Sequence, residues 1–292
     1  MNPKELATED ELGGGDSAKA KDRISRRDLL RWAGIGGTAA LATGSLGAIQ
    51  SSAIVVERRT LRLPKWDADG FRVAVVSDIH VNDAVCAARA KKAVRLALDE
   101  NPDLIVLPGD FINFSWSYMI DGMVKSLEGL HDAKCPVIGT LGNHDYWTFN
   151  PHDIIEAIKK RTNVKLLRNE STDVQGVTIA GIDDALVKMH RPAFVSDLRN
   201  KSVLVLFHEP DYVVETPKNA SLQISGHSHG GQVCLPFGAP ILTPFGAKRY
   251  KVGFYPEASV PLYVTRGVGT IGPPVRMFCP PEVSILTLRS AI

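Results

Sequence analysis

Five short apolar runs, each ending at a residue able to bind metal, constrain the fold of this chain more than any other feature. In each run, four to six mostly aliphatic residues are followed by an Asp, Asn or His. The runs span residues 73–80, 104–110, 137–145, 203–210 and 222–231. Buried strands of an α/β sheet have this composition, and ligands bind beyond the carboxyl ends of such strands. The pattern therefore predicts one polar site at the edge of an α/β sheet.

The polar residues at the ends of the runs offer three oxygen donors and four imidazoles. They are Asp78, His80, Asp110, Asn143, His208, His227 and His229. One histidine alone would more often be a surface or core residue. A whole set of such residues indicates a binding site instead, because unpaired buried carboxylates and imidazoles are costly to bring together. The set is large enough for two metal ions about 3.5–4 Å apart, if one carboxylate bridges them.

The same residues form five blocks in a fixed order. The blocks are Asp78–Ile79–His80, Gly109–Asp110, Gly142–Asn143–His144–Asp145, His208 and Gly226–His227–Ser228–His229. In this order they resemble the signature of the calcineurin-like metallophosphoesterases, which is D-x-H, G-D, G-N-H-[DE], H and G-H-x-H. The resemblance extends over roughly residues 70–290. The GHSHGGQ block and the later stretch LYVTRGVGTIGPPVRMFCPPE are similar to the bacterial YkuE/YaeI-like branch of that family.

The resemblance implies an α/β fold, a four-layer α/β/β/α sandwich of two mixed sheets flanked by helices. The hydrophobic pattern is compatible with this fold. It predicts strands near 54–64, 71–77, 104–107, 137–141, 164–167, 177–181, 203–207, 222–225, 231–234, 262–265 and 283–288. It predicts helices near 84–100, 118–130 and 192–199, and a further helix that starts at Pro151 with Asn150 as its cap. In the helix at 84–100 we expect Val85, Ala88, Val94 and Leu98 to form the buried face.

The resemblance also implies which residues bind which ion. Asp78, His80, Asp110 and His229 would hold the first ion. Asp110, Asn143, His208 and His227 would hold the second, so Asp110 would bridge the two. A mixed set of imidazole and oxygen ligands favours Zn, Mn or Fe over Mg or Ca, which prefer all-oxygen shells.

Two residues that follow Asn143 are expected to be catalytic. In the family that this chain resembles, the residue that corresponds to His144 lies over the phosphate and protonates the leaving group or stabilises its charge. Asp145 could hold the tautomer of that imidazole and raise its basicity.

Composition narrows the class of protein. The chain has 292 residues, 44% of them apolar and 23% charged, as in an ordinary globular protein. A net charge of +2 gives no support for binding to nucleic acid. The four cysteines, Cys86, Cys135, Cys234 and Cys279, form no C-x-x-C pair and allow three disulfide pairings. We expect free or buried thiols.

The N-terminal region is expected to be an export signal or an anchor. Residues 1–31 are polar and basic and are expected to be disordered. They carry Arg26–Arg27, which resembles a twin-arginine motif read by the Tat export machinery. Residues 32–53 are apolar, and cleavage after Ala53 would leave residues 54–292 as the metallophosphoesterase domain. Uncleaved, residues 32–56 are long enough to anchor the chain in a membrane. An ordinary surface helix is the remaining alternative. Export and anchoring both predict an extracytoplasmic location, in the periplasm or at the cell surface.

The substrate is the least constrained feature. Apolar residues flank the blocks: Phe111, Phe114, Trp116, Tyr118, Met119, Tyr146, Trp147, Phe149 and the stretch 235–246. If these residues are exposed, they could bind acyl chains or a membrane surface. If they are buried, they would only cover the domain core. Arg249, Lys251, Arg266 and Arg276 could pair with phosphate or simply be solvated.

We therefore expect a phosphoesterase that acts on a lipid- or envelope-linked phosphodiester or pyrophosphate. The resemblance keeps a UDP-2,3-diacylglucosamine-type pyrophosphate hydrolase open as an alternative. A non-catalytic scaffold that binds metal is a second alternative, although such a scaffold would need neither His144 nor Asp145.

Overall fold

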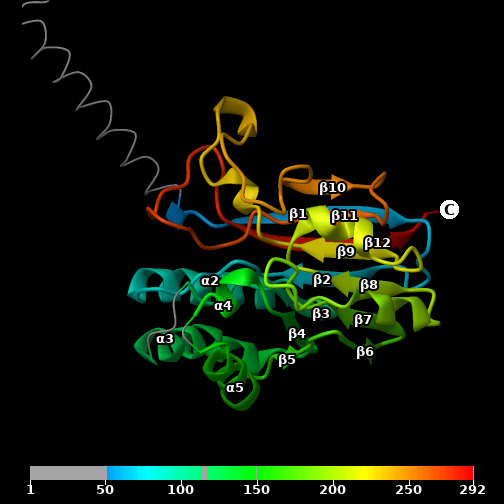
Figure 1. Cartoon of the computed structure of the whole chain (residues 1–292), viewed down its shortest axis with the longest axis horizontal. Helices are drawn as coiled ribbons and strands as arrows, with labels where there is room; N and C mark the ends of the chain where they lie inside the picture. The colour runs from blue at the N-terminus through cyan, green and yellow to red at the C-terminus, as the bar shows by residue number, and fades with distance from the viewer. Residues whose placement is uncertain (1–50, 114–116, 149, 292) are drawn as a thin grey trace, which may run out of the picture. The chain divides into compact units, whose positions relative to one another are not determined.

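The computed structural model describes residues 51–113, 117–148 and 150–291. In this part of the chain, the strands form two six-stranded sheets (Figure 1). The first sheet has the order β1 (Val55–Leu63), β12 (Glu282–Ser290), β2 (Phe71–Val75), β3 (Leu104–Pro108), β4 (Val137–Thr140) and β5 (Lys165–Leu166). The second has the order β10 (Gly253–Tyr255), β11 (Leu262–Val264), β9 (Leu222–Ser225), β8 (Val203–Leu206), β7 (Val177–Gly181) and β6 (Glu170–Val174). Both sheets are mixed, because β12 is antiparallel to β2 and β6 is antiparallel to β7.

Three α-helices cover one face of the first sheet. They are α2 (Ala84–Asp99), α3 (Ser117–Leu127), which the 3-10 helix η1 (Glu128–Asp132) follows directly, and α5 (Pro151–Arg161). Ala90, Met123 and Ile154 of these helices belong to one buried cluster with Ala74 and Ile105 of the sheet. Since successive side chains of a strand point to opposite faces, the residues next to Ala74 and Ile105 along their strands point to the other face of the first sheet.

That other side packs against the second sheet. Val73 and Val106 belong to a buried cluster with Leu204 and Ile224 of β8 and β9. The outer face of the second sheet is covered by two 3-10 helices, η2 (Pro192–Asp197) and η3 (Pro210–Glu215), through a third cluster. The predicted pair of mixed sheets flanked by helices is therefore confirmed, with short 3-10 helices over the second sheet.

The topology brings the predicted site residues to one edge. β2, β3 and β4 are parallel to one another, and so are β7, β8 and β9. The D-x-H, G-D, G-N-H-D, H and G-H-x-H blocks each follow one of these strands. The G-N-H-D block opens a short helix, α4 (Asn143–Tyr146), and His229 begins the 3-10 helix η4 (His229–Gly231).

Several local predictions were wrong. The edge strands β6 and β10 and the helix α4 were not predicted. Residues 231–234 form no strand but two isolated bridges, from Val233 to Met277 and from Cys234 to Pro240. In α2, Val94 is buried as predicted, but Val85 is 64% exposed. The other apolar residues of the buried face are Cys86, Ala90, Ala93 and Ala97. Alanine side chains are small and allow the helix to approach the sheet closely, so the alanine face of α2 packs against the sheet.

The N-terminal predictions fall largely outside the described residues. The polar region 1–31 with Arg26–Arg27 and most of the apolar segment 32–53 belong to residues 1–50. Among the described helices, none reaches the length and apolar character that crossing a bilayer requires. The four cysteines are described and are all free, as expected.

Candidate metal centre

The backbone at the strand ends is strained in a way that turns side chains toward one point. Asp78, His80, Asp110, His227 and His229 all have positive φ, between 43° and 66°. Residues other than glycine seldom adopt this conformation, which costs about 1 kcal/mol or more for each residue. Strain of this kind concentrates at functional sites, where the surrounding structure holds it in place.

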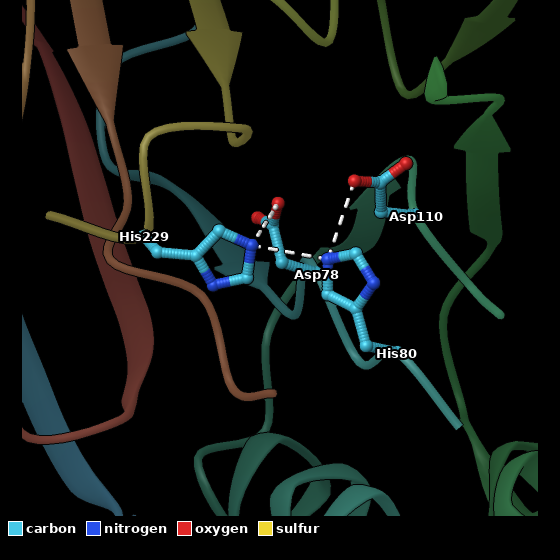
Figure 2. Close-up of side chains that lie close together, drawn as sticks. All are labelled: Asp78, His80, Asp110 and His229. Atoms are coloured by element: carbon cyan, nitrogen blue, oxygen red, sulfur yellow. Dashed lines mark hydrogen bonds and ion pairs between the residues drawn. The ribbon is translucent and has the colours of Figure 1, made fainter. Parts of the chain in front are cut away.

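The first group of candidate ligands combines residues from three of the blocks. Asp78, His80, Asp110 and His229 are buried, and one ligand atom from each lies within 4.8 Å of the others. Figure 2 shows the four side chains pointing toward one another. His80 Nε2 lies 3.2 Å from Asp110 Oδ2 and 3.0 Å from His229 Nε2. His229 Nε2 also lies 3.6 Å from Asp78 Oδ1.

The second group shares Asp110 with the first. Ligand atoms of Asp110, His208 and His227 also lie within 4.8 Å of one another, and His208 Nε2 is 3.2 Å from Asp110 Oδ2. Asn143 starts α4 and is buried. The backbone N–H of the next residue, His144, donates to Asp110 Oδ1 at 2.9 Å, so the start of α4 adjoins the shared carboxylate.

Outer contacts set the orientation of the two imidazoles in the second group. His208 Nδ1 lies 2.7 Å from the carbonyl oxygen of Pro108, and His227 Nε2 lies 2.7 Å from that of Phe245. A carbonyl can only accept, so each of these nitrogens carries the proton. The opposite nitrogen of each ring is then free to bind a cation, as is typical of ligating histidines.

Unsatisfied buried atoms test whether metal ions fit. Asp110 Oδ2, Asn143 Oδ1 and His208 Nε2 are buried and have no hydrogen-bond partner among the described residues. Buried polar atoms are nearly always paired in folded proteins, since leaving one unpaired costs about 1–3 kcal/mol. Divalent cations between the two groups would satisfy these atoms, so the residues fit a dinuclear site with Asp110 common to both ions.

The pKa values of the candidate ligands are shifted in both directions. Burial lowers the pKa of His208, but the charge of Asp110 outweighs burial and holds that pKa well above its ordinary value, so a metal ion that binds there displaces a proton from His208. Burial raises the pKa of Asp110, but the charges of His208 and His80 outweigh it and hold that pKa well below its usual value. Burial lowers the pKa of His227, and burial with the nearby His80 lowers that of His229 well below its ordinary value. An ionised carboxylate and neutral imidazoles are the forms that bind metal.

His144 lies at the edge of the two groups. Its ring meets that of His80 edge-on, with centroids 4.7 Å apart, and lies 5.1 Å from the ring of Trp147. Burial is the main cause that lowers the pKa of His144 to about 4. The free imidazole is therefore neutral at pH 7.

The carboxylate of Asp145 contacts the backbone around Asp110. Its two oxygens accept hydrogen bonds from the backbone N–H groups of Asp110, Phe111, Ile112 and Gly142, at 2.8–3.2 Å. Burial and the charge of Asp110 raise the pKa of Asp145 to about 7, and the N–H donors oppose that rise. The expected effect of Asp145 on the imidazole of His144 stays a prediction, whereas these bonds support a positioning role of Asp145 toward Asp110.

The four cations expected near the phosphate are mostly engaged elsewhere. Arg276 is fully buried and donates to the backbone carbonyls of Gly269, Arg266 and His229, while its guanidinium lies 3.4 Å from His229 Nδ1. Arg266 forms an ion pair with Glu282. Arg249 is exposed and stacks over the ring of Tyr250. Arg276 supports the His229 loop, a role that no motif in the sequence indicates.

A buried carboxyl pair beside the site also escaped prediction. Burial, and then Glu209, raise the pKa of Asp184 to about 9, so Asp184 is protonated at pH 7. Glu209 directly follows His208 in the sequence, and its carboxylate accepts from the backbone N–H of Ala185 at 3.3 Å. No motif contains Asp184, and only its proximity to Glu209 in the fold identifies it.

Comparison with known proteins assigns the family. The profile of the calcineurin-like phosphoesterases matches residues 71–231, which contain all five blocks. The chain is 30% identical over 289 residues to an uncharacterized metallophosphoesterase, YkuE, of Bacillus subtilis, and the match covers 92% of this chain and 99% of that protein. It is 31% identical over 239 residues to the phosphodiesterase YaeI of Escherichia coli, covering 79% of this chain and 87% of YaeI.

A third relative has a more specific name. The UDP-2,3-diacylglucosamine pyrophosphatase LpxG of Chlamydia muridarum is 27% identical over 308 residues, and the match covers 82% of this chain and 90% of LpxG. These matches extend over most of both chains and agree with the blocks and their geometry. The chain therefore belongs to the calcineurin-like phosphoesterase family, whose members are metal-dependent hydrolases of phosphoester bonds.

Proposed function

We propose that this protein hydrolyses a phosphodiester or pyrophosphate bond in a lipid- or envelope-linked substrate. The observation that carries the proposal is that two buried groups of candidate ligands share Asp110. In addition, one metal-binding atom each of Asp110, Asn143 and His208 is buried without a hydrogen bond in the described part of the chain. When bound, two divalent ions supply the Lewis acidity for attack of water on phosphorus. Mn, Zn and Fe are the metals that these ligands favour.

The side chains of this protein have distinct tasks in that reaction. Asp110 is held by the backbone bonds of its loop to Asp145, so its carboxylate needs no rearrangement when substrate arrives. His144, half-buried beside His80, has a neutral imidazole whose N–H can donate to the leaving-group oxygen. A hydrogen-bond donor aimed at developing negative charge stabilises the transition state electrostatically.

An apolar cavity beside the centre supports an apolar substrate. The cavity has a volume of about 660 Å³ and is lined by Trp147, Leu186, Tyr212 and Phe245, with Lys188 at its wall. Trp147 contacts His144, and the carbonyl of Phe245 accepts from His227. An acyl chain or another apolar group attached to the phosphate can bind there, while Lys188 can pair with a second phosphate.

A substrate comparison tests this proposal. The purified full-length chain is assayed with an aryl phosphomonoester, an aryl phosphodiester and UDP-2,3-diacylglucosamine, with bound metal measured in the same samples. We expect hydrolysis of the diester or of the lipid-linked pyrophosphate to exceed that of the monoester. Preferential cleavage of the pyrophosphate would select the alternative that the LpxG relative supports. Bound metal without hydrolysis of any of the three would favour the scaffold alternative.

We also propose that the protein acts outside the cytoplasmic membrane, on the basis of Arg26–Arg27 and the uncharged segment 32–56. Replacing both arginines by lysine keeps the charge but removes the twin-arginine motif. The variant should accumulate in the cytoplasmic fraction, measured by fractionation and immunoblotting. Export at the same level as wild type would refute the twin-arginine route.

A further inference from the structure

The segment 235–245, called the apolar loop below, exposes a cluster of large apolar side chains. Leu235 is 56% exposed, Phe237 fully exposed, Ile241 56%, Leu242 76% and Phe245 69%. In Figure 1 the gold segment that contains them projects beyond the two sheets. The alternative in which this stretch roofs the domain is therefore wrong. Contiguous exposed apolar side chains of this size mark an interaction surface.

The loop holds these side chains outward by its own hydrogen bonds. Leu235 donates its N–H to Ala239 at 2.8 Å, and Ile241 donates to Val233 at 3.2 Å. The 3-10 helix η5 (Pro236–Gly238) forms the tip, where Phe237 has a φ of 73°. A phenylalanine in this left-handed conformation is uncommon, and here it presents the ring to solvent. The exposure thus belongs to an ordered turn.

The charge around the loop suits an anionic surface. Between Glu215 and Glu257 the sequence has no acidic residue, whereas it has Lys218, Lys248, Arg249 and Lys251. The carboxylate of Asp211 accepts from the backbone N–H groups of residues 248–250. Glu57 and Glu282 line a pocket with Phe237. Each of them forms an ion pair with an arginine, Glu57 with Arg59 and Glu282 with Arg266. The side chains of Lys248 and Arg249 are exposed, at the base of the apolar loop.

Contacts at both ends of the loop relate it to the rest of the molecule. The carbonyl of Phe245, at its end, accepts from His227 of the candidate metal centre. Just before the loop, Cys234 donates its N–H to Met277 at 2.9 Å, and Val55 at the start of β1 donates to Pro281, also at 2.9 Å. The chain thus enters β1 close to the segment 277–281, where Phe278 is 47% exposed. The end of the uncharged segment 32–56 therefore lies in this region of the surface.

We propose that the apolar loop inserts Phe237, Ile241 and Leu242 into the interfacial layer of a lipid bilayer, with Lys248 and Arg249 against anionic headgroups. Exposed apolar side chains next to positively charged side chains are the combination that binds such interfaces. The loop is part of the folded domain and would contact lipid whether or not the N-terminal segment is retained. The same contact would place the candidate metal centre next to the headgroups.

The test locates the loop relative to the acyl chains. Phe237→Trp and Leu242→Trp are made in the full-length chain, with Val85→Trp and Val214→Trp as controls at apolar positions that are 64% and 63% exposed outside the loop. Each variant is mixed with vesicles of phosphatidylcholine and phosphatidylglycerol whose acyl chains carry bromine, which quenches tryptophan on contact. The emission of wild type is subtracted, because the chain has four tryptophans of its own.

We expect the tryptophans introduced by Phe237→Trp and Leu242→Trp to lose most of their added emission and the two control tryptophans to keep theirs. Vesicles of phosphatidylcholine alone should quench less, since they lack the anionic headgroups. If the two tryptophans introduced in the loop stayed unquenched, the proposal would be overturned, whether or not the chain sediments with the vesicles. Emission that is already blue-shifted without vesicles and unchanged by them would mean that a second copy of the chain covers the loop, which would also overturn it. The test does not involve hydrolysis, so its failure is distinct from failure of the proposed function.

Discussion

At the scale of single residues, the chemistry of the site depends on which side chains contact the ions and which only hold others in place. Asp110 belongs to both groups of candidate ligands. The ring of His144 meets that of His80 edge-on, and a backbone hydrogen bond with Asn113 opposes the fall of its pKa. Among the described residues, the carboxylate of Asp145 accepts from four backbone N–H groups, three of them in residues 110–112. These differences predict different phenotypes for neighbouring residues.

His144→Ala should retain the bound metal and lose turnover by about 10²- to 10³-fold, the usual loss when one hydrogen-bond donor to developing charge is removed. Metal content by atomic absorption and kcat on the preferred substrate check this expectation. His131→Ala, at an exposed histidine, is the control and should behave as wild type. Loss of metal in His144→Ala would show that His144 is a ligand instead.

Asp145→Asn should weaken metal binding about 10- to 100-fold, as loss of an outer partner of a ligand typically does. The amide places an N–H₂ group against backbone N–H donors, so the loop of Asp110 loses part of its support. Titration with Mn or Zn followed by calorimetry measures the affinity. Asp69→Asn is the matched control, because Asp69 also accepts from a backbone N–H, that of Ser290, far along the chain. Equal metal affinity in both variants would contradict a positioning role.

At the scale of secondary-structure elements, the site depends on how closely the ends of β2 and β9 approach. Gly226 follows β9, and a Cβ there would overlap the carboxylate of Asp78, which follows β2. This close contact explains the glycine of the G-H-x-H block. The two strands belong to different sheets, so Gly226 lies where the sheets meet.

Gly226→Ala should therefore displace Asp78 and reduce the metal content of the purified protein, measured by atomic absorption. Gly122→Ala is the control: its Cβ would meet only Val81, at 3.5 Å, and alanine in α3 should stabilise the fold slightly. If Gly226→Ala bound metal as well as Gly122→Ala does, the close approach would not matter for the site.

The elements differ in how well the sequence predicted them. Buried strands such as β3 and β8 have continuous aliphatic runs, and the blocks that follow them supplied every residue of the two ligand groups. The edge strand β6, with Glu170 and Asp173, lacks that signal because one face is solvated. The roles of Asp145 and Arg276 depend on partners far away in sequence, which periodicity cannot predict. Phe114, Trp116 and Phe149, which were expected to flank the site, lie outside the described residues.

At the scale of the whole molecule, each sheet supplies part of the site. Asp78, His80, Asp110 and Asn143 follow strands of the first sheet, and His208, His227 and His229 follow strands of the second. Neither sheet alone contains a complete set of ligands. Folding of the two-sheet core and assembly of the metal centre are therefore coupled, and bound metal should stabilise the folded protein.

The measurement that tests this account most directly is the number of ions bound by the full-length chain and by Asp110→Ala. We predict two divalent ions per wild-type chain, determined by atomic absorption against protein concentration. Asp110→Ala should lose both, because its carboxylate is common to the two ligand groups. A wild-type chain that binds at most one ion, or an Asp110→Ala variant that retains two, would contradict the account.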